Sequence, residues 1–372
     1  MTHFTLSHRL QSQNGKLVWF VLCGIGLLVL PFLLQPFGNA WMRIVDMALL
    51  YVMLALGLNI IVGFAGLLDL GYVAFFATGA YLMGLLGSPH LAETFPAVKA
   101  LFPAGIHYSI WVVLIAAAVL AGLVGVMLGA PTLKLRGDYL AIVTLGFGEI
   151  IRIFMLNLDR PINITNGPKG IMAIDPVTVF GVSLGQKLTV LGVTLQSVSL
   201  YYYLFLFLVL VIVVVSLNLE RSRIGRAWMA IREDEIAAKA MGLNTRNLKL
   251  LAFGMGASFG GVSGVMFASF QGFVSPESFS LMESVMIVAM VTLGGLGHIP
   301  GVILGALLLA ALPELLRHMA GPLTALTDGR LAPEILRQLL IALAMIVIML
   351  LRPRGLWPSP EHGQSLSKGD AA

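Results

Sequence analysis

The stretch LYYYLFLFLVLVIVVVSLN, residues 200–218, decides the class of fold, because it carries no charged residue over its whole length. An α-helix needs roughly 20 apolar residues to cross about 30 Å of hydrocarbon. The run is continuous and lacks the alternation of apolar and polar residues that a membrane β-barrel strand shows. The sequence therefore predicts a membrane-spanning helix here.

The composition of the whole chain agrees with this prediction. The 372 residues are 58% hydrophobic and 11% charged, and the mean hydropathy is +0.93. A soluble core of this length would need more charged residues to cover its surface. Basic residues beside apolar segments explain the pI near 9.4 without a nucleic-acid partner. The single cysteine, Cys23, excludes a disulfide within the chain.

Nine further segments have the same apolar character. The sequence predicts an all-α polytopic membrane protein with about ten transmembrane helices, forming a transmembrane domain over residues 17–352. The first apolar run has no small-x-small cleavage pattern after it, so we expect it to remain as a span. The predicted spans are residues 17–35, 41–62, 67–87, 110–130, 139–158, 200–218, 248–270, 282–297, 300–318 and 333–351.

Lysine and arginine are concentrated in the loops on one side of this arrangement. The loop 219–249 alone holds 11 of the 41 charged residues, which are 23 basic and 18 acidic. Loops rich in lysine and arginine stay in the cytoplasm. We therefore expect residues 1–16, the loop 219–249 and the tail 353–372 to be cytoplasmic. The long loops 88–109 and 159–199 would then be periplasmic.

The stretch REDEIAAKAMGLN, residues 232–244, is the most charge-dense part of the cytoplasmic loop. It predicts a short helix with acidic residues in its first turn, a lysine in its last turn and a glycine that ends it. One interpretation is a solvated loop helix; the other is a docking helix whose small alanines let a cytoplasmic partner approach closely. The residues concerned are Glu233, Asp234, Glu235, Ala237, Ala238, Lys239 and Gly242.

Several blocks of the sequence resemble one family. EDEIAAKAMGLN (233–244) resembles the coupling segment of ABC importer permeases, where a Glu-x-x-Ala-Ala…Gly pattern fits a cleft in the ATPase subunit. NIIVGFAGLLDLGYVAFFATGAY (59–81) and DYLAIVTLGFGEIIRI (138–153) resemble signature blocks of branched-chain amino acid permeases. TNGPKGI (165–171) and VTLGGLGHIPGVILGALLL (291–309) extend the resemblance, which is closest to the M-type subunit over roughly residues 40–352.

This resemblance implies a multi-subunit importer in the bacterial inner membrane. A homologous H-type permease would pair with this chain, two cytoplasmic ATPases would bind ATP and magnesium, and a periplasmic binding protein would deliver leucine, isoleucine or valine. The chain would carry no cofactor, and its only Gly-Lys pair, Gly15-Lys16, lacks the context of a phosphate-binding loop. ATP-driven movement of the 233–242 helix would produce alternating access.

Four polar residues are expected within predicted spans: Asn59, Asp69, Glu149 and Arg152. Such groups face protein or water, because a charge in the bilayer centre costs about 2.5–3.5 kcal/mol on insertion scales. Glu149 and Arg152 are three residues apart and can pair on one helix. They are either an internal ion pair that fixes packing or part of the pathway of a zwitterionic amino acid. Asp69 is either a pathway residue or simply hydrated near the inner surface.

Two glycine clusters have packing or gating interpretations. The first, Gly256, Gly260 and Gly264, has the small-xxx-small spacing that allows close helix packing. Its Gly256-x-Ser258-x-Gly260 match to a hydrolase nucleophile elbow would need a strand-turn-helix context. The second cluster predicts a tight turn or a broken helix between the eighth and ninth spans. Its members are Gly294, Gly295, Gly297 and Gly301.

Three other classes of function stay open at this point. A secondary transporter driven by an ion gradient needs midplane carboxylates, for which Glu149 is a candidate. An intramembrane enzyme needs a catalytic constellation, of which Ser258 would be an isolated member. A permease for sugars or other amino acids would share the coupling helix. Histidine and cysteine spacings predict no metal site.

Overall fold

The computed structural model describes most of the chain. It covers residues 24–326 except 104, 134, 136, 180, 191 and 192, together with 339, 342–343, 346–347, 350–351 and 355–357. The predicted N-terminal segment, the first part of the first span, most of the tenth span and most of the C-terminal tail lie outside the described residues.

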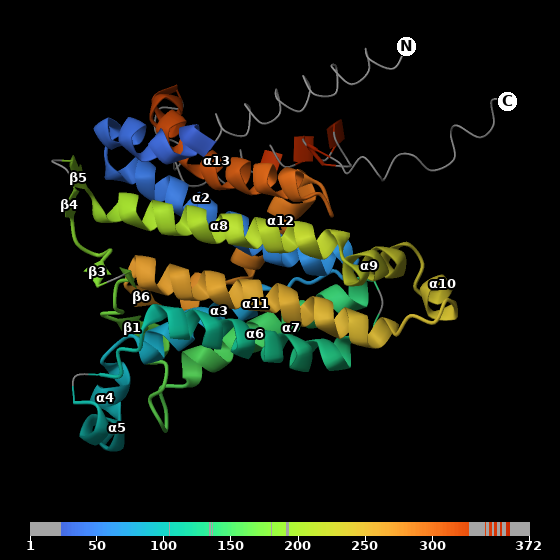
Figure 1. The fold of residues 1–372 in the computed structure, drawn as a ribbon, viewed down its shortest axis with the longest axis horizontal. Helices are drawn as coiled ribbons and strands as arrows, with labels where there is room; N and C mark the ends of the chain where they lie inside the picture. The colour runs from blue at the N-terminus through green and yellow to red at the C-terminus, as the bar shows by residue number, and fades with distance from the viewer. Residues whose placement is uncertain are drawn as a thin grey trace, which may run out of the picture.

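Long helices lying side by side form the body of the molecule (Figure 1). Five of the described helices are long and apolar enough to cross a membrane, and four more apolar helices are shorter. All nine overlap predicted spans, whereas the number ten and the orientation of the termini stay predictions. The long ones are Asn39–Phe64, Ile110–Thr132, Asp138–Asn157, Ser197–Arg221 and Thr245–Gln271. The shorter ones are Gly24–Leu34, Val73–Leu86, Leu281–Gly294 and Ile299–Pro313.

In Figure 1 these helices, apart from Gly24–Leu34, carry the following labels. They are α2 (Asn39–Asn59), α3 (Val73–Leu86), α6 (Ile110–Thr132), α7 (Asp138–Asn157), α8 (Ser197–Arg221), α11 (Thr245–Gln271), α12 (Leu281–Gly294) and α13 (Ile299–Leu326). The π-helical turn η2 (Ile60–Phe64) continues α2, and Gly63 within it leaves room for the Asn59 side chain and the Gly297 backbone.

Short elements occupy the two ends of the bundle. Three antiparallel strand pairs, which the all-α prediction did not include, lie at one end with α4 (His90–Thr94) and α5 (Pro96–Leu101). The helices α9 (Arg223–Glu233) and α10 (Glu235–Ala240) lie at the other end (Figure 1). The remaining elements are η1 (Gln35–Phe37), η3 (Gly167–Lys169), η4 (Pro276–Phe279), β1 (Ile171–Met172), β2 (Thr178–Val179), β3 (Val182–Ser183), β4 (Leu188–Val190), β5 (Val193–Leu195) and β6 (Phe273–Val274).

The strand pair β1–β6 ties the long loop 159–199 to the end of α11, with Ile171 opposite Val274. Both of these side chains are fully buried, so this part of the loop is fastened to the bundle. The pairs β2–β3 and β4–β5 are local hairpins within the loop. The strands are therefore small additions to a helical fold and do not form a separate domain.

Helix α11 packs closely against α2, α3 and α6 because glycines line its contact faces. A Cβ on Gly79 of α3 would overlap the carbonyl group of Gly261, and one on Gly264 would overlap backbone atoms of α3. The Tyr72 hydroxyl group donates a hydrogen bond of 3.0 Å to the Gly256 carbonyl oxygen. Close backbone contact stabilises the association of membrane helices through dispersion forces, because the surrounding lipid is apolar and no hydrophobic effect drives the helices together.

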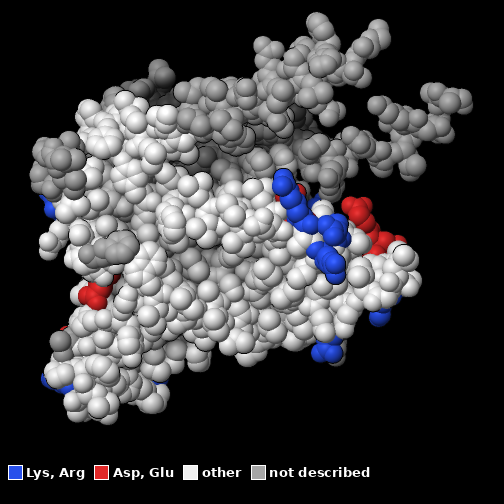
Figure 2. Space-filling view, in the orientation of Figure 1, with Lys and Arg blue, Asp and Glu red and all other residues white. Residues whose placement is uncertain are grey.

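Charged side chains gather at the two ends of the molecule on the face that Figure 2 shows, and the middle of that face is free of them. Large apolar side chains are exposed on the long helices α6, α7 and α8, among them Ile115, Leu123, Ile150 and Val214. An uncharged apolar band between polar ends is the surface that a lipid bilayer solvates.

Candidate functional site

Helices α9 and α10 replace the single short helix expected in the charged loop. The Ser222 hydroxyl group caps α9 by accepting a hydrogen bond of 3.1 Å from Gly225 N. The Asp234 carboxylate caps α10, because its Oδ1 accepts from Ile236 N at 2.8 Å and from Ala237 N at 3.1 Å. The expectation that three acidic residues share one first turn is therefore wrong: Glu233 ends α9, Asp234 is the cap and Glu235 begins α10.

The far end of α10 follows the sequence closely. Lys239 lies in its last turn, and Gly242 follows with a φ of +86°, a conformation that glycine adopts without steric cost. The expected alanine face of α10 is present in part, because Ala237 and Ala240 are exposed. Ala238 is only 4% exposed and packs against the chain itself, so the expectation that this residue belongs to the face is wrong. Two larger apolar side chains are exposed beside the alanines: Ile236, 69% exposed, and Met241, 84% exposed.

Both helices are fastened to the beginning of α11. The Lys249 Nζ lies 2.7 Å from Glu235 Oε2, and the Lys249 side chain is 9% exposed. The indole N–H of the fully buried Trp228 donates a hydrogen bond of 2.7 Å to the Leu248 carbonyl oxygen. A displacement of α10 would therefore act directly on α11, the helix at the centre of the bundle. We call α9 and α10 together with the C-cap residue Met241, residues 223–241, the α9–α10 unit.

Arg232 connects the α9–α10 unit to a second point in the bundle. Its Nη1 donates a hydrogen bond to the Gly63 carbonyl oxygen in η2. A Cβ on Gly66 or Gly297 would crowd the Arg232 side chain, so these two glycines border its path. Partial burial lowers the pKa of the guanidinium group, and the nearby Glu233 charge acts in the opposite direction. Arginine remains protonated in such a setting.

Asn59 meets the same junction from the side of α2. Its Oδ1 accepts a hydrogen bond of 2.9 Å from Gly297 N, and the side chain is 1% exposed. The structure thus places this predicted pathway residue at a joint between α2 and the turn that precedes α13. Gly294 ends α12, and Gly295 and Gly297 have φ values of +117° and +80° in that turn.

A cleft of about 340 Å³ separates the α9–α10 unit from the loop that follows η2. Its charged wall consists of Asp138, Arg232, Glu235 and Lys249, and its apolar wall includes Leu67 and Leu68. Glu235 and Lys249, which form an ion pair, both line this cleft.

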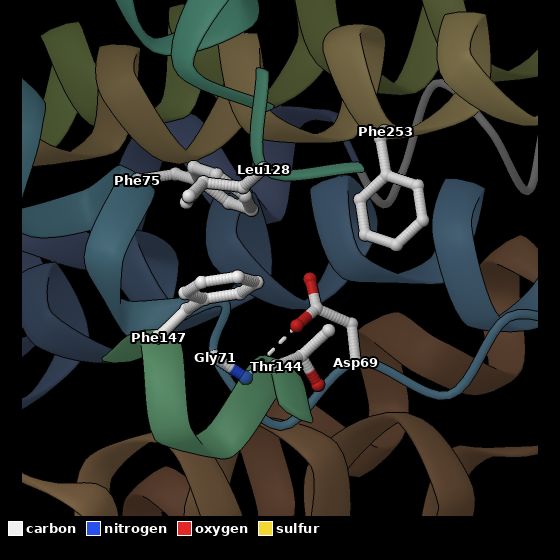
Figure 3. Close-up of a pocket in the computed structure, with 7 residues that line it drawn as sticks. All are labelled: Asp69, Gly71, Phe75, Leu128, Thr144, Phe147 and Phe253. Atoms are coloured by element: carbon white, nitrogen blue, oxygen red, sulfur yellow. Dashed lines mark hydrogen bonds between the residues drawn. The ribbon is translucent and has the colours of Figure 1, made fainter. Parts of the chain in front are cut away.

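Asp69 is buried and not hydrated as one interpretation of the sequence expected, since it is 1% exposed. Its Oδ1 accepts a hydrogen bond of 2.8 Å from Gly71 N. Its Oδ2 has no hydrogen-bond partner among the described residues. Figure 3 shows the carboxylate at the edge of a small cavity between side chains of α3, α6, α7 and α11.

Glu149 and Arg152 lie further along α7 and do not line the Asp69 cavity. They form an ion pair with 3.0 Å between Arg152 Nε and Glu149 Oε2. Arg152 Nη1 also lies 3.8 Å from Oε1 of Glu277, whose side chain is 69% exposed. The four predicted pathway residues are therefore spread over three places and do not form one site.

The glycines of α11 face neighbouring helices along its length. Gly256 faces Gly57 and Ile61, Gly260 faces Tyr72 and Phe75, and Gly264 faces α3. Ser258 Oγ donates to the Gly254 carbonyl oxygen at 2.9 Å within the same helix. A residue inside a continuous helix does not have the strand-turn-helix setting of a nucleophile elbow. Among the described residues no group of three metal-ligating side chains converges.

Three features were missed in the sequence. Asp46 in α2 is fully buried, and neither of its carboxylate oxygens has a partner among the described residues. A carboxylate inside the predicted span 41–62 was a visible signal. The Arg232 contact with Gly63 and the outward position of Met241 left no signal, because both depend on how distant segments pack.

Comparison with known proteins identifies the family. The family model described as branched-chain amino acid transport system, permease component, matches residues 41–350. The chain belongs to this family. The permease is 39% identical over 381 residues to the high-affinity branched-chain amino acid transport system permease protein LivM of Escherichia coli, covering 97% of this chain and 80% of that protein.

Two further relatives define the limits of the similarity. A probable branched-chain amino acid transport permease protein LivM of Methanocaldococcus jannaschii is 25% identical, with 83% of this chain and 90% of that protein covered. The LivH permease protein of Salmonella typhimurium is 33% identical over 140 residues, which is 38% of this chain and 41% of that protein. No solved structure matches the permease. Family and apolar helices together identify a multi-pass membrane protein.

Proposed function

We propose that this permease is the M-type subunit of an ATP-driven importer of branched-chain amino acids in a bacterial inner membrane. The observation that carries the proposal is its 39% identity to a LivM protein over 97% of the chain. The α9–α10 unit supports it, because a short capped helix with exposed apolar residues lies where the family resemblance places the coupling segment.

The proposed assembly contains more than this chain. The similarity to LivH as well as LivM proteins supports pairing with a homologous H-type permease. Two ATPases would bind ATP and magnesium on the cytoplasmic side, and a periplasmic binding protein would deliver leucine, isoleucine or valine. The permease itself would hold no cofactor and hydrolyse nothing.

The contacts of the α9–α10 unit suggest how movement would pass into the membrane. An ATPase that binds the exposed side chains of Ile236 and Met241 would displace α10 when it changes conformation. Lys249 and Trp228 would carry the displacement into α11, and Arg232 would carry it into η2 and the turn before α13. Helices α2, α11 and α13 would then tilt together and open the pathway to alternate sides of the membrane.

Reconstitution tests the proposal directly. The complete complex of both permeases and the ATPases is placed in vesicles with binding protein outside and ATP inside, and uptake of radiolabelled leucine is measured. We expect saturable leucine uptake that requires both ATP and the binding protein. Leucine uptake driven by a proton or sodium gradient without ATP would instead make the chain part of a secondary transporter. Uptake of ribose but not of leucine would make it a sugar permease.

A further inference from the structure

The loop that carries Asp69 is held rigidly by backbone contacts on two sides. Leu70 N donates a hydrogen bond of 3.0 Å to Thr144 Oγ1 on α7, and Ser284 Oγ on α12 donates one of 2.5 Å to the Leu70 carbonyl oxygen. Gly71 lies so close to the Thr144 carbonyl oxygen that a Cβ would overlap it. These contacts fix the Asp69 side chain without occupying its second oxygen.

Asp69 Oδ2 lies in a cavity whose other side chains are almost all apolar. Figure 3 shows this oxygen turned away from Gly71, towards the space bordered by Phe75, Phe147, Phe253 and Leu128. Thr144 is the other polar side chain there, but its hydroxyl group accepts from Leu70 N and donates to the Ala141 carbonyl oxygen. An unpaired buried carboxylate is unfavourable, so its position calls for a cationic or donating partner.

The side chains that line the cavity determine which partner suits the Asp69 carboxylate. A water molecule needs two to four polar partners, and the polar side chains of this cavity are Asp69 and Thr144, whose hydroxyl group is already engaged by Leu70 N and the Ala141 carbonyl oxygen. An ammonium group can bind the carboxylate by a charge-assisted hydrogen bond and lie against aromatic rings at the same time. An aliphatic chain attached to that ammonium group would contact the phenylalanine and leucine side chains.

We propose that Asp69, with the aromatic wall around it, binds the α-ammonium group of an aliphatic amino acid as it crosses the permease. The inference rests on the proposed function and adds to it the residue that recognises the substrate's positive end. It also assigns a role to the unpartnered oxygen, which packing alone leaves unexplained.

The described conformation would be the closed state of this site. The cavity measures about 10 Å³, which is room for about one water molecule and too small for leucine. Helix α7 supplies Thr144 and Phe147 to the wall of the cavity, and only 22% of its apolar stretch is buried within the chain. Its displacement would open the cavity beside Asp69.

The test is binding of radiolabelled leucine to the purified complex of both permeases and the ATPases, with leucine uptake by the same preparation in vesicles. Competitors are 3-methylbutylamine, which has the ammonium group and the aliphatic chain of leucine, and 4-methylpentanoate, which has the chain and a carboxylate. We expect the amine to displace leucine from the wild-type complex and 4-methylpentanoate to compete much more weakly. This comparison needs no substituted protein.

Asp69→Asn keeps the acceptor for Gly71 N but removes the charge, and it should weaken leucine binding by about tenfold or more. Asp46→Asn is the matched control, because Asp46 is also a buried carboxylate without a partner among the described residues. It should bind leucine as the wild type does.

Each failure has a distinct meaning. If wild-type vesicles import leucine and Asp69→Asn binds and imports it equally well, the ammonium site is wrong and the proposed function stands. Failure of the amine to compete with leucine at the wild-type complex also overturns the site. The site is overturned as well if leucine binding to the wild-type complex requires sodium and this requirement is lost in Asp69→Asn. If the wild-type complex imports no leucine, the proposed function fails and the site fails with it.

Discussion

At the scale of the residue, glycine allows the helices of this permease to touch backbone to backbone. A methyl group on Gly79 of α3 would overlap the Gly261 carbonyl group of α11, and one on Gly261 would overlap atoms of α6. Gly146 on α7 is also inside a helix, but a Cβ there would meet nothing within 4 Å. Substitutions of Gly79 and Gly146 therefore distinguish the effect of close helix packing from the general effect of replacing a glycine inside a helix.

Gly79→Ala should lower stability and Gly146→Ala should not. Overpacking costs about 1–3 kcal/mol, whereas alanine inside a helix is about 0.5–1 kcal/mol more favourable than glycine. Thermal unfolding of the detergent-solubilised complex measures both, and we expect a lower midpoint only for Gly79→Ala. Equal midpoints for the two variants would contradict the described α3–α11 contact.

The glycine spacing on α11 was sufficient to predict close packing of that helix, because small residues every four positions form one face. The places of the polar residues could not be predicted in the same way. Asp69 lies near the end of a predicted span, and whether it meets water or protein depends on α7 and α12, which are distant in the sequence. Glu149 and Arg152 were predictable as a pair because both lie on one helix.

At the scale of the element, the α9–α10 unit is the part of the molecule best suited to a partner. Its inner side is fixed by Trp228, Arg232 and Lys249, and its outer side exposes Ile236 and Met241. Exposed apolar side chains beside charged ones are typical of protein interfaces.

Met241→Glu should reduce binding of the ATPases, because it places a charge where an apolar side chain would be buried. Met172→Glu is the matched control: Met172 is 64% exposed on β1, at the opposite end of the bundle. Co-purification of the ATPases with each variant is the measurement. We expect a loss of about tenfold or more for Met241→Glu, as for an interface hot spot, and none for Met172→Glu. The reverse pattern would refute the assignment of the docking surface.

The helix break at Asp234 shows why element boundaries are harder to predict than elements. The acidic residues, the glycine stop and the alanines together predicted a short helix at nearly the right place, but they did not predict that Asp234 would be its cap. That Ala238 faces inward is decided by α11 and its Lys249, which bonds Glu235. Local patterns carry no information about which side of a short helix the rest of the chain covers.

At the scale of the whole molecule, the chain has an apolar middle and two polar ends of different kinds. One end carries the strand pairs, α4 and α5, and the other carries the α9–α10 unit (Figure 1). The concentration of basic residues in the loop 219–249 predicts that the second end is cytoplasmic.

Labelling with a membrane-impermeant maleimide tests this orientation. The chain has one cysteine, so Cys23→Ser provides a background for Met172→Cys and Met241→Cys. We expect Met172→Cys to react from the periplasmic side in intact spheroplasts, and Met241→Cys to react only after the membrane is permeabilised. Labelling of Met241→Cys in intact spheroplasts would show that the predicted orientation is inverted.

In the proposed mechanism, Arg232 carries the movement of the α9–α10 unit into η2 and the turn before α13, and leucine import depends on this contact. The most direct measurement is the number of leucine molecules imported per ATP hydrolysed by the reconstituted complex. Arg232→Met should continue to hydrolyse ATP while this ratio falls about tenfold, and Arg223→Met, an exposed arginine on the same helix, should keep the wild-type ratio. A wild-type ratio in Arg232→Met would contradict the account.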